Sequence, residues 1–120
     1  MAVMRYIVAD VDAAIGFYAN LGFEVEKNFA PAMAIVRRDD LDLWLAGPTA
    51  SASRPMPDGR QPEPGGWNRV ALTVEDLSAT VETLRAAGVP FRNDIVTGPG
   101  GQQILCEDPS GNVVELFEPA

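Results

Sequence analysis

Three kinds of side chain in this sequence could act together on a small molecule: arginine, carboxylate and tryptophan. A carboxylate such as Glu115 could serve as a general base, and an arginine such as Arg69 could stabilise an oxyanion. Tryptophan adds a flat apolar surface for stacking and one hydrogen-bond donor. The candidate ligand-binding residues are Arg5, Asp42, Trp44, Trp67, Arg69, Glu115 and Phe117, and Glu115 is the candidate catalytic residue.

These candidates fall on alternate positions of four apolar segments, which predicts strands that present them on one face. In LDLWLA, residues 41–46, leucines alternate with Asp42 and Trp44, and in WNRVALTV, residues 67–74, Trp67 and Arg69 alternate with valine and leucine. Segments 3–8 and 113–117 divide in the same way. We expect the uniformly apolar faces to lie under helices and the four mixed faces to line a concave binding surface.

An internal repeat organises the chain into two similar halves. VADVDAAIGFYANLGFEV, residues 8–25, and VEDLSATVETLRAAGVPF, residues 74–91, align with Asp10 on Asp76 and Gly22 on Gly88. Each aspartate stands where a helix N-cap is favoured, and each glycine where a left-handed residue ends a helix. Apolar residues recur at three- and four-residue spacing between them. Each half therefore predicts a helix that follows a strand.

Short β-prone runs separated by turn residues follow each helix. In the first half they are 23–29, 32–38 and 41–46, with a turn at 39–40; in the second they are 89–95, 102–108 and 112–118, the last two joined by the turn DPSGN. GPGG, residues 98–101, predicts a hairpin loop rather than a phosphate cradle, because a strand and not a helix follows it.

The expected architecture is one α+β domain over residues 1–120, made of two βαβββ modules at about 1–46 and 67–120. A module of this size buries too little surface to be stable alone, so the two should pair about a pseudo-twofold axis. The proline-rich linker 47–66 between them is either a flap or a tether. The result is a curved mixed sheet around a cleft, with the helices on its outer face.

Composition narrows the location and the partners. The chain is 47% hydrophobic, carries a net charge of −8, and has no apolar run long enough for a membrane-spanning helix. Such acidity disfavours nucleic acid and anionic membranes. The lone Cys106 excludes an internal disulfide, and with no histidine to activate it we expect it to be a buried structural residue. These features indicate a cytoplasmic protein.

The order of elements, the repeated V-x-D-V/L-x-x-A/T-I/V pattern, the helix-ending LGF and the segment DPSGNVVELFEP resemble the vicinal oxygen chelate superfamily. This superfamily includes glyoxalase I, extradiol dioxygenases, fosfomycin-resistance transferases and bleomycin-resistance binding proteins. The resemblance implies the doubled fold with a ligand cleft and a homodimer, sometimes with halves exchanged between subunits.

The resemblance also implies where a metal would bind. Metal-dependent members place histidines seven residues before each capping aspartate, and here those positions hold Val3 and Arg69. The remaining ligands match Glu115 and, by symmetry, Asp42. Valine is no donor and arginine repels a divalent cation, so we expect a site without metal and no cofactor, although two carboxylates could hold a hard ion loosely.

Three functions are compatible with these residues. The first is a non-catalytic, antibiotic-resistance-type protein that sequesters an aromatic or cationic molecule in an acidic, tryptophan-lined cleft. The alternative is a lyase, isomerase or dioxygenase that uses a degenerate metal site or a carboxylate base, either Glu115 or Asp42. An accessory module whose cleft serves dimerisation is the third. The missing histidines favour the first.

Overall fold

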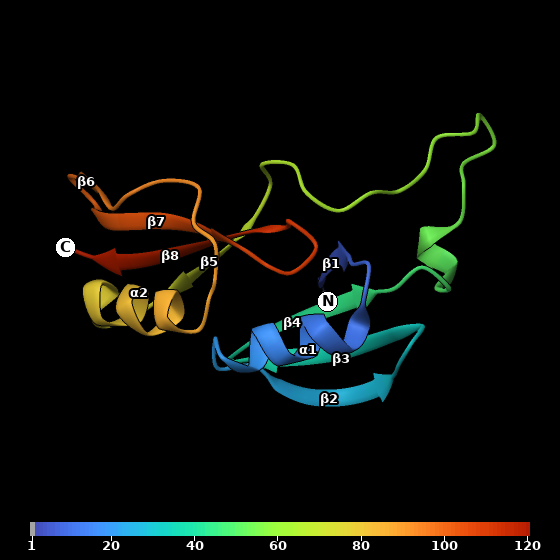
Figure 1. The fold of residues 1–120 in the computed structure, drawn as a ribbon, viewed down its shortest axis with the longest axis horizontal. Coiled ribbons are helices and arrows are strands. Elements are labelled where there is room, and N and C mark those ends of the chain that lie inside the picture. Colours follow the sequence, from blue (N-terminus) through green and yellow to red (C-terminus); the bar gives the residue numbers. More distant parts are fainter. Residues whose placement is uncertain (1) are drawn as a thin grey trace. The chain divides into compact units, whose positions relative to one another are not determined.

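A computed structural model describes residues 2–120 and divides them into two compact units (Figure 1). Unit 1 runs to Gly65 and also contains Pro109–Asn112, whereas unit 2 comprises Gly66–Asp108 and Val113–Ala120. Each unit holds one helix and one four-stranded mixed sheet, which confirms the predicted α+β class and the doubling. Neither helix in the described part of the chain has the length and apolarity to cross a membrane.

Unit 1 contains the strands β1 (Met4–Ile7), β2 (Glu24–Phe29), β3 (Met33–Arg38) and β4 (Leu41–Ala46) and the helix α1 (Val11–Ala19). The strand order is β1-β4-β3-β2, in which β1 runs parallel to β4 and the other pairs are antiparallel. The helix packs on β2, β3 and β4, as Figure 1 shows.

Unit 2 repeats this topology with β5 (Val70–Thr73), β6 (Val96–Gly98), β7 (Gly101–Glu107), β8 (Val113–Pro119) and α2 (Leu77–Ala86). The order β5-β8-β7-β6 again combines one parallel pair, β5 with β8, and two antiparallel pairs. The helix packs against β8. The two halves of the repeat therefore build the same sheet, strand for strand.

Both helices begin and end as the repeat predicts. Asp10 and Asp76 are the N-caps, and their carboxylates accept hydrogen bonds from Ala13 N at 3.1 Å and Ala79 N at 3.0 Å. Gly22 and Gly88 follow the helix ends with φ of 86° and 83°, a conformation that costs glycine no Cβ clash. Each helix is thus placed on its sheet by the same two local signals.

The strand faces predicted to be apolar form the cores. Leu43 and Leu45 of β4 are buried, as are Val114 and Leu116 of β8. In unit 1 the helix adds Tyr18, whose ring makes edge contacts with Tyr6, Phe17 and Phe23. Burial of each such side chain contributes about 1.5–3 kcal/mol to folding. The opposite, mixed face of each sheet is not covered by the helix of its own unit.

One predicted strand is wrong. Residues 89–95 form no strand and touch β7 through one isolated bridge, Phe91 to Cys106. Pro90 has no amide hydrogen, and the Asn93 side chain replaces the backbone as the acceptor for Leu105 N at 2.9 Å. The edge strand β6 consequently starts only at Val96, and GPGG forms the expected hairpin loop between β6 and β7.

The proline-rich segment 47–65, here called the strap, folds back on unit 1. Its short 3-10 helix η1 (Ser51–Ser53) is fixed by the Ser53 hydroxyl, which donates to Gly47 O at 2.7 Å, and Gln61 Nε2 donates to Ser53 O at 3.0 Å. At its far end Gly65 N donates to the buried side chain of Asn112, which itself donates to Ile7 O, both at 2.8 Å. The strap is therefore tied to the end of β1.

Candidate functional site

In unit 1 the helix-free face presents Arg5 and Trp44 together. They are direct neighbours in the parallel β1–β4 pair, so both side chains project from the same face. The Arg5 guanidinium carbon lies 5.0 Å from the centroid of the Trp44 ring, a cation–π contact. This is the only interaction that the structure gives the guanidinium among residues 2–120, so its hydrogen-bond donors are available to a ligand.

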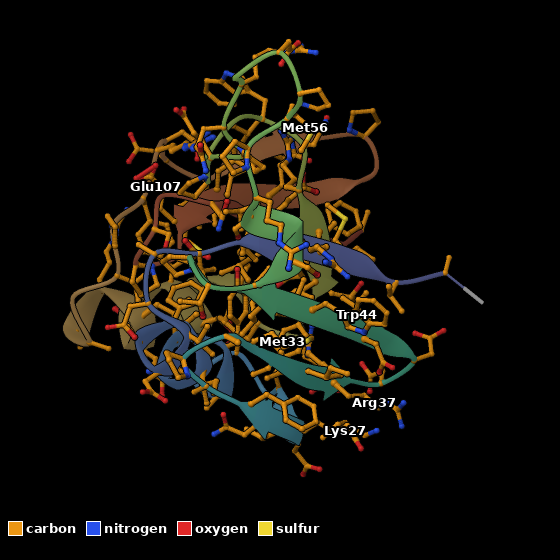
Figure 2. All side chains as sticks on the ribbon, turned by 90° about the vertical axis from the view of Figure 1, so that its right-hand side faces the viewer. Lys27, Met33, Arg37, Trp44, Met56 and Glu107 are labelled. Carbon is orange, nitrogen blue, oxygen red and sulfur yellow. The ribbon has the colours of Figure 1, made fainter. Side chains whose placement is uncertain are left out.

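Trp44 carries a second unused donor. The ring is half-buried, and its Nε1 is covered by protein atoms yet has no hydrogen-bond partner in the described residues. An unpaired buried N–H costs about 1–3 kcal/mol. Figure 2 labels Trp44 of β4 together with Met33 and Arg37 of β3 and Lys27 of β2, three strands of the same sheet.

Asp42 is bound by Arg37, a residue that the sequence analysis missed. The Arg37 Nε and Nη2 atoms donate to the two carboxylate oxygens at 2.6 and 3.1 Å, and Glu26 lies 3.6 Å from Nη1. The hydrogen bond from Arg37 holds the pKa of Asp42 below its usual range, and that of Arg37 is raised in turn. The lowered pKa of Asp42 therefore does not favour the general-base hypothesis, which requires a raised one.

In unit 2 Arg69 pairs with Glu115. Arg69 Nε and Nη2 each lie 3.0 Å from Glu115 Oε1, and Nη1 donates to Trp67 O at 3.3 Å. The Glu115 side chain is 14% exposed, so the pair is partly desolvated. Phe117 stands two residues further on the same face of β8. Arg69 neutralises Glu115 alone, and Asp42 has a different partner.

Trp67 is the most exposed large apolar side chain in the described structure, at 68%. One face of its ring is covered by Arg92, whose guanidinium carbon lies 4.6 Å from the ring centroid. Arg92 is itself held by Glu107 Oε2 at 3.0 Å and by Gly66 O at 2.8 Å. Arg92 and Glu107 are not among the candidates chosen from the sequence. The turn at 39–40, by contrast, sets the register of β3 and β4 and could have identified Arg37 as the residue opposite Asp42.

The structure thus gathers the seven candidates into two groups. Arg5, Asp42 and Trp44 share the helix-free face of unit 1, and Trp67, Arg69, Glu115 and Phe117 belong to unit 2. Each group contains one arginine–tryptophan contact, made by Arg5 in unit 1 and by Arg92 in unit 2. In each unit a second arginine, Arg37 or Arg69, neutralises the carboxylate.

A family model described as the Glyoxalase/Bleomycin resistance protein/Dioxygenase superfamily matches residues 1–116. The chain belongs to this superfamily. The match covers nearly the whole sequence and confirms the resemblance inferred from the repeated helix starts and the C-terminal segment. No curated protein sequence matches the chain.

Solved structures agree on the fold of the superfamily. The lactoylglutathione lyase of Agrobacterium tumefaciens is 23% identical with a TM-score of 0.72, over 98% of this chain and 92% of that one. A superfamily member from Sphaerobacter thermophilus is 25% identical with a TM-score of 0.71, over 98% of this chain and 97% of that one. The fosfomycin resistance protein of Listeria monocytogenes is 16% identical with a TM-score of 0.72, over 100% and 93%.

The strand register corrects one predicted equivalence within the repeat. Arg5 pairs with Trp44 in unit 1, and Ala71, the residue that matches Arg5, pairs with Glu115 in unit 2. Trp44 and not Asp42 therefore stands at the position equivalent to Glu115. Asp42 matches Val113 instead, because it lies two residues before Trp44.

The residues present do not fit a metal of the kind found in the superfamily. The positions implied for ligands hold Val3, Trp44, Arg69 and Glu115, of which one is a metal donor. That donor is bound by an arginine, whose charge opposes a cation. In residues 2–120 no group of three or more histidine, cysteine, aspartate or glutamate side chains could hold a metal ion.

Cys106 lies on the helix-covered side of β7. Its side chain is fully buried, and burial raises the pKa of its thiol to about 12. A thiol with so high a pKa is protonated at neutral pH and is a poor nucleophile. The buried position agrees with the structural role expected from the sequence.

Proposed function

We propose that this protein binds a small aromatic molecule without metal and without chemical turnover, in the manner implied by the bleomycin resistance proteins of its superfamily. The observation that carries the proposal is the arginine–tryptophan stack in each unit, Arg5 with Trp44 in unit 1 and Arg92 with Trp67 in unit 2. A tryptophan ring held in place by an arginine offers a flat binding surface whose side-chain entropy is already reduced.

The carboxylates support binding rather than catalysis. A general base must reach a proton on the substrate with its own oxygens and have a pKa near the working pH. Asp42 is engaged at both oxygens and its pKa is lowered, and Glu115 is held by Arg69. An enzyme of the superfamily remains the alternative, with Glu115 as its base, but no contact of these carboxylates favours it.

The test is to titrate the protein with a panel of soluble aromatic compounds and to measure binding by tryptophan fluorescence and by calorimetry. Trp44→Leu and Trp67→Ala should each weaken binding by about 1 to 3 kcal/mol if the ring contacts the ligand. Met56→Ala, a change at an exposed apolar residue of the strap, is the matched control and should have no effect.

Unchanged affinity in both tryptophan variants would contradict the proposal. Turnover of a bound compound that disappears in Glu115→Gln, with the fold intact by circular dichroism, would establish the enzyme alternative instead.

A further inference from the structure

The strap lines one side of a pocket in unit 1. The pocket has a volume of about 180 Å³ and is lined by residues of β1 and the loop after it and by the strap, namely Ile7, Val8, Ala9, Pro48, Ser53, Gln61, Pro62 and Pro64. Most of these residues are apolar. Because an apolar cavity of roughly 150 Å³ holds a benzene ring, this pocket has room for one small ring.

The side of the pocket that the strap forms is held in place by hydrogen bonds. The Ser53 hydroxyl and the Gln61 amide join the two limbs of the strap, and Asn112 joins its end to Ile7. Asn112 is buried, so its two hydrogen bonds with Gly65 and Ile7 are protected from water. This side of the pocket is therefore preformed, which lowers the entropy lost when a ligand binds.

Arg5 stands next to this pocket. Ile7, which lines the pocket, is two residues from Arg5 and on the same face of β1, so the two positions are about 6.6 Å apart along the strand. Asp42, an acid on the same face of the sheet, is already engaged by Arg37. Arg5 therefore offers an unpaired guanidinium beside an apolar pocket.

The geometry points to a small aromatic carboxylic acid as the ligand of unit 1, with its ring in the pocket under the strap and its carboxylate on Arg5. This inference goes beyond the proposed function, because neither tryptophan lines the pocket. It selects an anionic ligand where the acidic composition alone suggested a cationic one. A guanidinium binds a carboxylate through two parallel hydrogen bonds, which an amine or a neutral amide cannot reproduce.

Three probes of similar size separate charge from shape: benzoate, benzamide and benzylamine. Calorimetry should show that benzoate binds about tenfold or more tightly than the other two, because a hydrogen bond to a charged group contributes about 1.5–3 kcal/mol. In nitrogen-edited NMR spectra, benzoate should shift the amide signals of Ile7, Ser53 and Gln61 and the indole signal of Trp44.

Two variants locate the two ends of the ligand. Arg5→Gln should remove the preference for benzoate over benzamide, whereas Arg54→Gln, the same change at an exposed arginine of the strap, should preserve it. Ala9→Leu adds volume at an exposed residue of the pocket wall and should weaken benzoate binding while the rest of the NMR spectrum stays native.

Equal binding of the three probes, or a benzoate affinity that Arg5→Gln leaves unchanged, would overturn the inference while the proposed function stands. Tightest binding by benzylamine, failure of all three to bind at millimolar concentration, or signal shifts confined to residues outside the pocket would overturn it as well. The proposed function fails separately, through the two tryptophan variants and the wider aromatic panel.

Discussion

At the scale of single residues, arginines decide which groups of the site are available. Arg37 and Arg69 engage the two carboxylates that the sequence offers as bases or metal ligands. Arg5 and Arg92 instead lie over tryptophan rings. Arginine suits both tasks because its planar guanidinium forks onto carboxylates and also stacks on aromatic faces. The net result is a site whose unused groups are a guanidinium and aromatic surface.

The Arg37–Asp42 pair gives a pH prediction. In the native protein the Asp42 carboxyl should titrate below its ordinary pKa of about 3.9, and Arg37→Gln should raise the pKa toward that value. Because the folded-state pKa is the lower one, the pair stabilises the fold above the unfolded-state pKa, and this contribution is lost as pH falls through the folded-state pKa. Carbon-detected NMR titration of the carboxyl measures both midpoints.

Arg54→Gln removes one positive charge from the strap and is the control for the charge lost in Arg37→Gln. It should leave the titration midpoint of Asp42 unchanged. Coincident midpoints in native protein and Arg37→Gln would show that the ion pair does not form in solution.

At the scale of elements, the capping aspartates and the strand alternation place the site. Each aspartate starts a helix directly after a parallel strand, and that helix covers the apolar face of its sheet. The mixed face is then left for Trp44 in one unit and Glu115 in the other. The same local signals thus leave two equivalent faces with different chemistry.

The two caps should contribute similarly to stability. Asp10→Ala and Asp76→Ala should each lower the free energy of unfolding by about 0.5–2 kcal/mol, because each leaves an amide of the first helical turn without its acceptor. Urea denaturation at neutral pH measures the change. Glu82→Ala, an exposed position inside α2, should stay within about 0.5 kcal/mol of the native protein. A cap variant as stable as this control would argue against the cap geometry.

At the scale of the whole molecule, membership of the superfamily fixes the fold but not the chemistry. The chain matches a family model over residues 1–116 and solved structures over nearly its full length. Its charged side chains nonetheless stand in arrangements unsuited to a divalent cation. The homodimer implied by the superfamily stays a prediction, which light scattering of the purified protein can check.

Metal addition tests the chemistry at this scale. The melting temperature of metal-stripped protein should not change with excess Mn²⁺, Ni²⁺, Zn²⁺ or Mg²⁺. Specific binding at a thousandfold above the dissociation constant would add about 4 kcal/mol and raise the midpoint by several degrees. A clear rise with stoichiometric bound metal would contradict the proposed metal independence and make Glu115 a candidate ligand.

The sequence by itself determined the repeated strand-helix units, the helix ends and the faces of the strands, because caps, glycines and alternation act through neighbouring residues. It also shows valine and arginine, Val3 and Arg69, at the two positions where the resemblance implies histidine ligands. Only the tertiary structure decided that Arg69 meets Glu115 and that Arg92 meets Glu107, because these partners lie 46 and 15 positions apart in the sequence. It also decided that 89–95 is no strand, since the Asn93 side chain takes the hydrogen bond of Leu105 N. The pocket that the strap lines near Arg5 likewise depends on a distant contact, that of Asn112 with Ile7.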